Sequence, residues 1–300
     1  MLPADPAGAV GAEDDPAPGS VGPTVPVRPL TFRELLDVPF ALVQANIGAL
    51  VRLAAAGLVV AEIFVMAVTV GVSTLTDGSD DGIWWAAVLS TVLAAWALRF
   101  LLRGTTVALG LADVAGRRIG WRAALDRMGS VVQPMALFEL PYTLIWAVTF
   151  IAFCLLLNAV PALGITLLVL FAFFGVPFVG RWRVRHYVAV PVIFAERADR
   201  TTAAGRTKLL VAGKEWSLTG LWLAHRGLLL LLMLPLLGLG LFIADFSGTR
   251  MWTVVTLTTS AMLLFLAFGE LVESATRVVS YLDLRCRREG LDIRIPEQVR

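Results

Sequence analysis

Six ionisable residues lie inside long apolar stretches or at their ends, where a charged side chain is costly. They are Glu62, Arg99, Glu139, Glu270, Glu273 and Arg277. In a lipid environment such side chains face a polar interior, pair with an opposite charge or become neutral. Carboxylates placed there can bind an ion, a proton or a polar substrate, and they can equally form structural ion pairs between helices. These six residues are therefore the candidate functional residues of the chain.

Glu62 lies near the middle of the first apolar stretch, residues 53–72. One hypothesis is a site for an ion or substrate within the membrane. The other is a hydrogen bond or ion pair with a neighbouring helix, for which Arg99 in the second stretch is the natural partner. We expect the pairing with Arg99 and keep the ion or substrate site as the alternative.

Glu139 stands two residues before Pro141 in the third apolar stretch. Proline frees a backbone carbonyl and kinks a helix, and polar groups at broken helices are typical of transporter sites. A kink stabilised only by packing is an equal alternative. Near the inner end of the last helix, Glu270, Glu273 and Arg277 share one helix face, and the spacing of Glu273 and Arg277 predicts an i,i+4 ion pair. We expect these three residues to form a structural network near the membrane interface.

The sequence contains no catalytic or metal-binding motif. Nucleophile-elbow, P-loop, dinucleotide and zinc-protease patterns are all missing. His186 and His225 lack a Cys, Asp or His at ligand spacing, and Cys154 and Cys286 suggest neither a disulfide framework nor a metal cluster. We therefore predict that the protein is not an enzyme, and we expect no cofactor and no metal.

Six apolar stretches dominate the chain, which is 58% hydrophobic and only 16% charged. They cover residues 53–72, 83–102, 135–157, 161–180, 227–246 and 252–268. Each is close to the ~20 residues that a helix needs to cross a ~30 Å hydrocarbon layer. Short connectors join them in pairs. The sequence therefore predicts an all-α fold, a six-span transmembrane bundle built as three helical hairpins.

The basic residues predict the orientation of this bundle. Of the 25 Lys and Arg residues, only Arg250 falls in a short connector, whereas the long segments between hairpins are rich in arginine. Cytoplasmic segments carry an excess of Lys and Arg, so we predict a multi-pass protein of the cell membrane with both termini in the cytoplasm. This topology explains the basic residues without nucleic acid, so the expected partners are the lipid bilayer and possible membrane proteins.

Amphipathic segments precede the hairpins. Residues 31–37 show capping-box spacing between Thr31 and Glu34, and Pro39 is expected to kink or interrupt the helix. Residues 120–126 repeat the pattern, with Trp121 at the position of Phe32. We expect both segments to lie at the cytoplasmic interface. The second helix of each hairpin is expected to continue past the bilayer, over residues 83–116, 162–196 and 252–289.

The two ends differ from the rest in composition. Residues 1–28 are rich in Pro, Gly, Ala and acidic residues and lack the apolar core of a signal peptide. We predict a disordered tail there, a membrane domain over residues 29–292 and a short C-terminal tail over residues 293–300.

Residues 28–37 and 281–292 resemble the two ends of a family of uncharacterised actinobacterial multi-pass membrane proteins, and residues 191–216 are similar in pattern. That family looks related to the membrane domain of glycerophosphoryl diester phosphodiesterases. The resemblance implies six helices and no known activity. It transfers no catalytic residue, because the soluble phosphodiesterase barrel has no room in this chain.

Two functions remain open on these observations. We expect a non-enzymatic scaffold or partner subunit in envelope or membrane homeostasis. The alternative is a transporter or lipid-handling protein that uses Glu62, Glu139 and Arg99 in a polar cavity.

Overall fold

The computed structural model describes residues 25–246 and 250–290, and the regular secondary structure in these ranges is entirely helical. The all-α expectation is confirmed for this part of the chain. The elements are α1 (Phe32–Ala45), α2 (Ile47–Leu75), α3 (Asp80–Val114), α4 (Trp121–Ala159), α5 (Pro161–Leu170), the π-helical η1 (Phe171–Gly175), α6 (Val176–Val184), α7 (Ala189–Glu196), α8 (Arg200–Val211), α9 (Glu215–Phe246) and α10 (Arg250–Glu289).

Four helices in the described residues are long and apolar enough to span a membrane. They are Ile47–Leu75, Asp80–Val114, Glu215–Pro235 and Trp252–Glu289. Each exceeds the ~20 residues that a bilayer crossing needs. The chain thus has the construction of a membrane-embedded protein, as its composition predicts.

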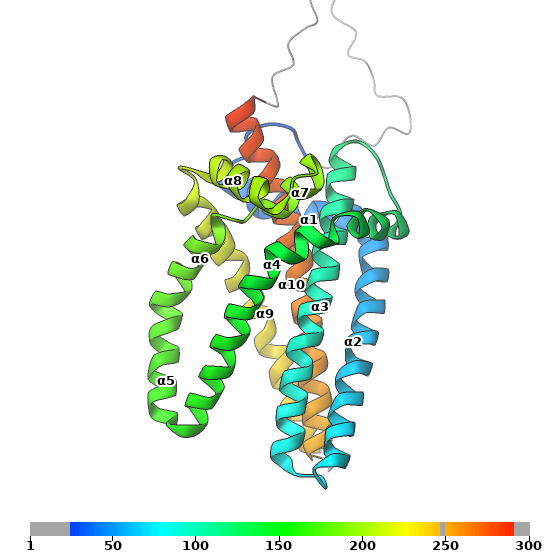
Figure 1. The fold of residues 1–300 in the computed structure, drawn as a ribbon, viewed down its shortest axis with the longest axis vertical. Coiled ribbons are helices and arrows are strands. Elements are labelled where there is room, and N and C mark those ends of the chain that lie inside the picture. The colour runs from blue at the N-terminus through cyan, green and yellow to red at the C-terminus, as the bar shows by residue number, and fades with distance from the viewer. Residues whose placement is uncertain (1–24, 247–249, 291–300) are drawn as a thin grey trace, which may run out of the picture.

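The helices gather at one end and separate toward the other (Figure 1). Helix α3 packs against α2, α4 and α10, and α10 also packs against α9. The first turns of α4 cross one end of the molecule, and the rest of the helix descends beside α5 (Figure 1). Helices α1, α7 and α8 lie at the same end as the last turns of α3 and α10. We call this set of helices the head.

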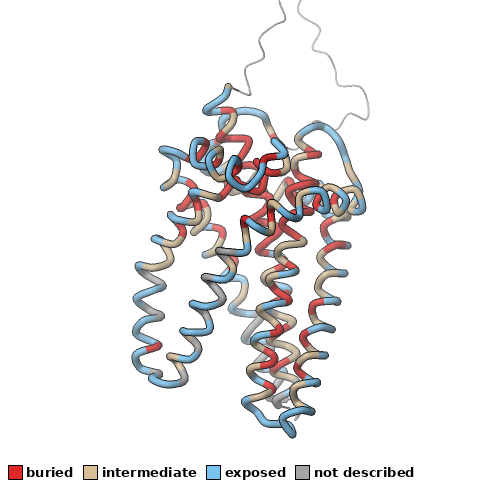
Figure 2. Tube along the Cα trace, viewed as in Figure 1, coloured by how far each residue is buried: buried red, intermediate tan, exposed pale blue. Residues whose placement is uncertain are grey.

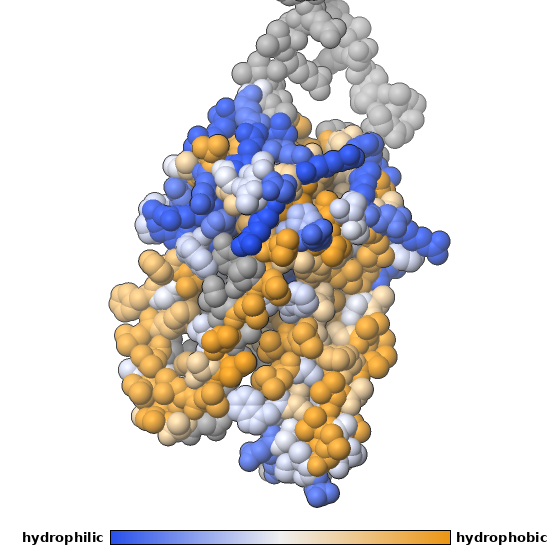
Figure 3. Space-filling view, in the orientation of Figure 1, coloured by the Kyte–Doolittle hydropathy of each residue, from blue (hydrophilic) through white to orange (hydrophobic). Residues whose placement is uncertain are grey.

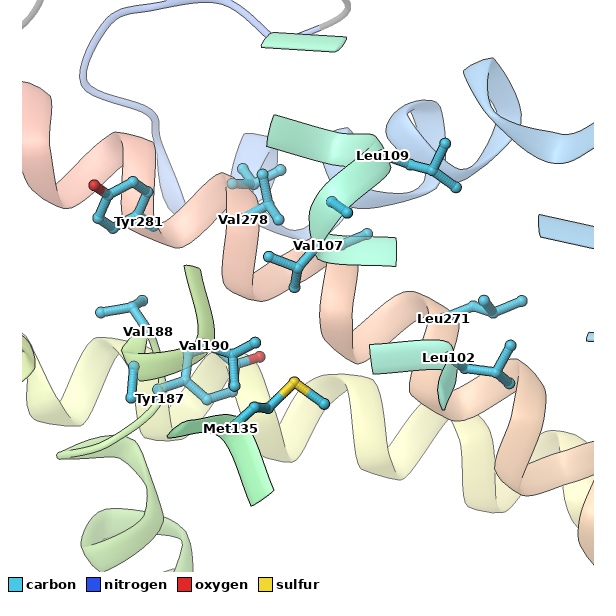
Figure 4. Close-up of a cluster of buried hydrophobic side chains, with 14 of the residues drawn as sticks. Leu102, Val107, Leu109, Met135, Tyr187, Val188, Val190, Leu271, Val278 and Tyr281 are labelled. Atoms are coloured by element: carbon cyan, nitrogen blue, oxygen red, sulfur yellow. The ribbon is translucent and has the colours of Figure 1, made fainter. Parts of the chain in front are cut away.

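The head contains most of the tightly packed core. Figure 2 shows buried residues concentrated there, and Figure 3 shows polar surface over the head and apolar surface over the long helices. In the core, Met135 of α4 lies next to Tyr187 and Val190, with Leu271 and Val278 of α10 nearby (Figure 4). Along the long helices apolar side chains point outward, because lipid is the solvent there.

The local signals that start the helices are confirmed. Thr31 caps α1, and its side chain and that of Glu34 form the reciprocal capping box. Hydrogen bonding to the Thr31 backbone, and then to Arg28, lowers the pKa of Glu34 to about 2. Helix α4 begins at Trp121, the position that corresponds to Phe32 at the start of α1.

The continuity of the helices differs from expectation in three places. Pro39 does not end α1, which runs on to Ala45. The amphipathic segment that starts at Trp121 and the third apolar stretch belong to one helix, α4. The helix expected over residues 162–196 is broken, because α6 ends at Val184 and α7 starts at Ala189. Pro191 lies in the first turn of α7, where its missing N–H costs no hydrogen bond.

The predicted tails fall largely outside the described residues. Residues 1–24 and 293–300 are not described, nor are residues 247–249 of the last short connector. Val25, inside the predicted N-terminal tail, is fully buried in the core cluster. The packed part of the chain therefore begins earlier than the predicted boundary after residue 28.

Candidate functional site

Charged residues from five helices form one continuous chain of contacts where the long helices enter the head. We call it the ion-pair chain. Its members are Arg99 and Arg103 of α3, Glu139 of α4, Arg183 of α6, Arg226 of α9, and Glu270, Glu273 and Arg277 of α10. Five of the six candidate residues lie here, all except Glu62, together with three arginines that flank apolar stretches.

Glu270 anchors one end of the ion-pair chain. Its carboxylate accepts a hydrogen bond from Arg99 Nε at 2.9 Å, and two from Arg103, at 2.6 Å from Nε and 2.9 Å from Nη2. The Ser274 hydroxyl donates a further bond at 3.1 Å. Arg99 and Arg103 are one helical turn apart, so both reach the same face of α10. These contacts satisfy the lone pairs of a carboxylate that is almost completely buried.

Glu139 joins the two halves of the ion-pair chain. Its carboxylate pairs with Arg103 of α3, and its other oxygen lies 3.6 Å from Arg277 Nη1 of α10. The Glu139 side chain, two residues before Pro141, thus fixes α4 against two other helices. This arrangement favours a structural role for Glu139 over an open transport site.

Glu273 anchors the other end. Arg277 Nη2 donates to it at 2.7 Å, which confirms the i,i+4 pair, and Arg183 Nη2 donates to the same oxygen at 2.8 Å. Arg226 of α9 binds the second oxygen. The Arg277 guanidinium also lies 5.3 Å from the centre of the Tyr187 ring. Glu273 therefore holds α6 and α9 to α10.

The ion-pair chain carries an excess of positive charge. Five guanidinium groups share three carboxylates, so each arginine has a carboxylate partner and the ion-pair chain has a net charge of two positive units. In a low-dielectric region an uncompensated charge is strongly unfavourable, so it attracts an anion or water. The arginines at the two ends, Arg99, Arg183 and Arg226, are the most exposed members, with 19–30% of each side chain accessible.

Glu62 lies apart from this cluster. The expected pairing with Arg99 is wrong, because Arg99 binds Glu270. Glu62 Oε1 instead accepts a hydrogen bond from Thr259 Oγ1 of α10 at 3.1 Å, and Oε2 is buried without a hydrogen-bond partner among residues 25–246 and 250–290. The reason is depth: Glu62 lies near the middle of its span, whereas Arg99 sits one turn from Arg103 and faces the head.

Sequence analysis missed Arg103, Arg183 and Arg226 as site residues. All three were explained as flanking charges that set topology, and nothing local distinguishes them from exposed arginines. One signal was available. Arg99 and Arg103 repeat at i,i+4, which matches the spacing of Glu270 and Ser274 on one face of α10.

A second set of contacts joins the two ends of the described chain. The Leu30 amide donates to Asp283 Oδ1 at 2.7 Å, and Arg287 donates to the Leu30 carbonyl at 2.5 Å. Arg287 Nε also lies 3.0 Å from Asp283. Residues 28–37 and 281–290, the described parts of the two segments that carry the resemblance, thus contact each other in the head.

The arrangement can clamp helices together and attract an anion, and its carboxylates are occupied by arginine. Near it, His225 Nδ1 lies 3.0 Å from the Leu221 carbonyl, and burial lowers the pKa of His186. Burial also raises the pKa of Tyr187, so its phenol stays neutral. Comparisons with family models, with curated proteins and with solved structures find no match to this chain.

Proposed function

We propose that this protein is a non-enzymatic scaffold or partner subunit of the cell membrane, with six spans in three hairpins and both termini in the cytoplasm. Four of the six spans are the long apolar helices named above. The other two are α4 and the uninterrupted run of α5, η1 and α6 from Pro161 to Val184. The contact between Leu30 and Asp283 supports termini on one side, because it places both ends of the described chain in the head.

The observation that carries the proposal is an apolar arm, formed by the later turns of α4 together with α5 and η1. Within the described residues, α5 has extensive contacts only with α4 and η1. Large apolar side chains on it are open to the surroundings, and Phe174 and, just beyond it in α6, Phe178 are each 74% exposed. A transmembrane helix pair that packs mainly on itself offers its sides to lipid or to helices of another protein.

The π-helical turn gives this arm an irregular surface. The Phe171 ring lies directly over Gly175, where no Cβ could be placed without moving the ring. Turns of this kind inside α-helices occur frequently at functional sites. The turn therefore supports a specific contact surface over a purely lipid-facing one.

Site-specific crosslinking in cells tests this proposal. A photoreactive residue in place of Phe174 or Phe178 should give a discrete adduct with another protein. A position that faces only lipid should give no such adduct. Val60 of α2, which is 68% exposed, is the matched control. Identical, lipid-only products from all three positions would contradict the partner-subunit proposal.

A role in envelope or membrane homeostasis, and the relationship to the membrane domain of the phosphodiesterases, are further parts of the proposal. A deletion strain should show altered tolerance of membrane-active agents. Expression of the full-length protein in this strain should restore the original tolerance. A Phe174→Ala, Phe178→Ala double variant that inserts normally into the membrane should not restore it. If the double variant restored the tolerance, the phenotype would not depend on the exposed phenylalanines of the arm.

Transport or lipid handling is the second candidate, and one atom favours it. Glu62 Oε2 is buried beside α10 with no hydrogen-bond partner in the described part of the chain. Such an atom suits a carboxyl that binds an ion. Glu62→Gln keeps the shape and the bond to Thr259, so a stable but inactive variant in the complementation assay would favour transport. Full activity of Glu62→Gln would remove the basis for this candidate.

A further inference from the structure

Two adjoining hollows lie on the head, between the turn that joins α8 to α9 and the last turns of α10. The larger has a volume of about 450 Å³ and is lined by Ala212, Gly213, Lys214, Leu284, Arg287 and Arg288. The smaller, of about 180 Å³, shares Lys214, Leu284 and Arg287 with it and extends to the start of α1. We call the two together the head pocket. Sites for small molecules typically have ~300–1,000 Å³, so the head pocket is large enough for one.

The head pocket is basic. Lys214, Arg287 and Arg288 line its larger hollow, and all three residues are exposed, so a ligand can reach them from the surface. Among the residues that line the two hollows, Asp283 is the one acidic residue. Three positive charges and one negative charge leave a net charge of two positive units. A phosphate monoester carries a charge of about −1.5 to −2 at pH 7, which matches this excess.

The two arginines of the head pocket are held in place by the protein itself. Arg287 Nε lies 3.0 Å from both carboxylate oxygens of Asp283, and Nη2 donates to the Leu30 carbonyl. Arg288 donates from Nε and Nη2 to two backbone carbonyls at the end of α8. Within the described part of the chain, Nη1 of each arginine has no hydrogen-bond partner. Fixed guanidinium groups with a nitrogen to spare are well suited to the oxygens of a phosphate.

The turn between α8 and α9 adds to the positive potential. Gly213 has a φ of 77° or close to it in the left-handed region that favours glycine, which lets α9 start directly after α8. Lys214 forms no ion pair and no side-chain hydrogen bond among residues 25–246 and 250–290. Ser217 and Leu218 line the smaller hollow, so this hollow lies at the N-terminus of α9, the end of a helix that attracts anions.

The position of the head pocket favours a water-soluble ligand. From Trp252 to Arg287, α10 is ~53 Å long at ~1.5 Å per residue, whereas the hydrocarbon layer is ~30 Å thick. The last turns of α10 lie in the head (Figure 1), where the surface is polar (Figure 3). The head pocket thus lies beyond the hydrocarbon layer, out of reach of most lipid phosphates.

We propose that the head pocket binds a soluble phosphate monoester whose organic part is apolar or aromatic. The phosphate lies in the larger hollow, where it accepts hydrogen bonds from Lys214, Arg287 and Arg288. The organic part lies in the smaller hollow, against Phe32 of α1 and Leu218 of α9. The ligand thereby joins α1, α9 and α10, and its binding does not depend on the partner contacts proposed for the apolar arm.

Thermal unfolding of the full chain in phosphatidylcholine nanodiscs tests this proposal. The probes are inorganic phosphate, adenosine monophosphate and adenosine, each compared with chloride at equal ionic strength. A ligand that binds only the folded state raises the unfolding midpoint, so millimolar inorganic phosphate should raise it by a few degrees. Adenosine monophosphate should give the same increase at a concentration about tenfold lower, because its base fills the smaller hollow. Adenosine should leave the midpoint unchanged.

The two lysines of the chain provide a matched pair of variants. Lys214→Gln removes a charge that lines the head pocket and breaks no contact within the described residues, so it should fold normally and lose at least half of the increase. Lys208→Gln removes the same charge from an exposed position on α8 that lines neither hollow, and it should keep the full increase. Equal responses of the two variants, or no increase with either phosphate-bearing probe, would overturn the proposal.

Two further measurements identify the organic part and the source of the phosphate. Phe32→Ala should reduce the response to adenosine monophosphate to that of inorganic phosphate, because it removes the exposed ring beside the smaller hollow. An undiminished response would overturn the placement of the organic part. Nanodiscs that contain phosphatidic acid present a phosphate monoester on a lipid. An increase with phosphatidic acid that Lys214→Gln abolishes, without a response to the soluble probes, would overturn the assignment to a soluble ligand.

Discussion

Arg103 shows how a residue's neighbours decide its role. Its side chain is only 4% exposed, and it lies between the carboxylates of Glu270 and Glu139. A guanidinium in this position links α3 to α4 and to α10. Removal of one partner from such a buried group is far more costly than removal of a surface partner, because the remaining charge stays buried.

We expect Glu270→Gln to lower the free energy of unfolding by ~3–5 kcal/mol, since it leaves Arg99 and Arg103 without their shared carboxylate. Asp37→Asn is the matched control, because Asp37 pairs with Arg33 at 3.8 Å on a strongly exposed surface. Its effect should stay within ~1 kcal/mol. Chemical unfolding in detergent measures both, and equal effects would mean that the ion-pair chain is not stabilising.

Glu34 makes the start of α1 sensitive to pH. Its pKa in the folded protein is about 2 against an ordinary value of 4.5, so the charged form is favoured by folding. The stabilisation is complete above about pH 4.5 and is lost as the pH falls toward 2. The difference in unfolding midpoint between the natural protein and Glu34→Gln should therefore shrink over this window. A constant difference would show that the capping box does not depend on the charge.

At the scale of the helices, close approach depends on small residues. Gly110 of α3 faces α1 and α10, and an added Cβ would lie 3.0 Å from Leu42 and 3.3 Å from Val278. Gly57 of α2 similarly faces Leu98 of α3, and small residues let helices approach closely. These contacts set the distances at which the helices pack in the head.

The same substitution at two helical glycines should therefore have opposite effects. Gly110→Ala crowds Leu42 and Val278 and should destabilise the protein by ~1–3 kcal/mol. Gly129→Ala on α4 meets nothing within 4 Å, and it should stabilise by ~0.5–1 kcal/mol through lower backbone entropy in the unfolded chain. Unfolding in detergent measures both signs. A stabilising Gly110→Ala would show that α1, α3 and α10 can separate without cost.

At the scale of the whole molecule, the orientation in the membrane can be tested with reporter cysteines at exposed positions on the two ends of the long helices. Ser79 lies in the exposed turn between α2 and α3, and Arg33 lies on the exposed face of α1 in the head. Cys286 is buried and cannot report the side of the membrane. Reporter cysteines at positions 79 and 33 are therefore better placed, in a chain whose two natural cysteines are replaced by alanine.

We expect Ser79→Cys to react with an impermeant maleimide in intact cells, and Arg33→Cys to react only after the membrane is opened. The physical reason is that the head is rich in arginine, and cytoplasmic segments of membrane proteins carry an excess of Lys and Arg. The labelled fraction is measured by gel shift. Reaction of Arg33→Cys in intact cells, with protection of Ser79→Cys, would reverse the proposed orientation.

Local physical chemistry in the sequence determined the helical class, the capping box at Thr31 and Glu34, the start of α4 at Trp121 and the apolar helices that can span a membrane. Each depends on neighbours within a few residues or on the length of an apolar run. The i,i+4 pair of Glu273 and Arg277 belongs to the same kind of signal.

Only the tertiary structure decided which charges meet. Arg99 could have reached Glu62 or Glu270 on the basis of sequence, and the choice depends on the depth and rotation at which α3 packs against α2 and α10. Arg183 and Arg226 are far apart in the chain and meet at Glu273 because Trp222 fits over Gly180. Ion pairs between helices join residues that are distant in sequence, and no local sequence pattern specifies how the helices that carry them pack.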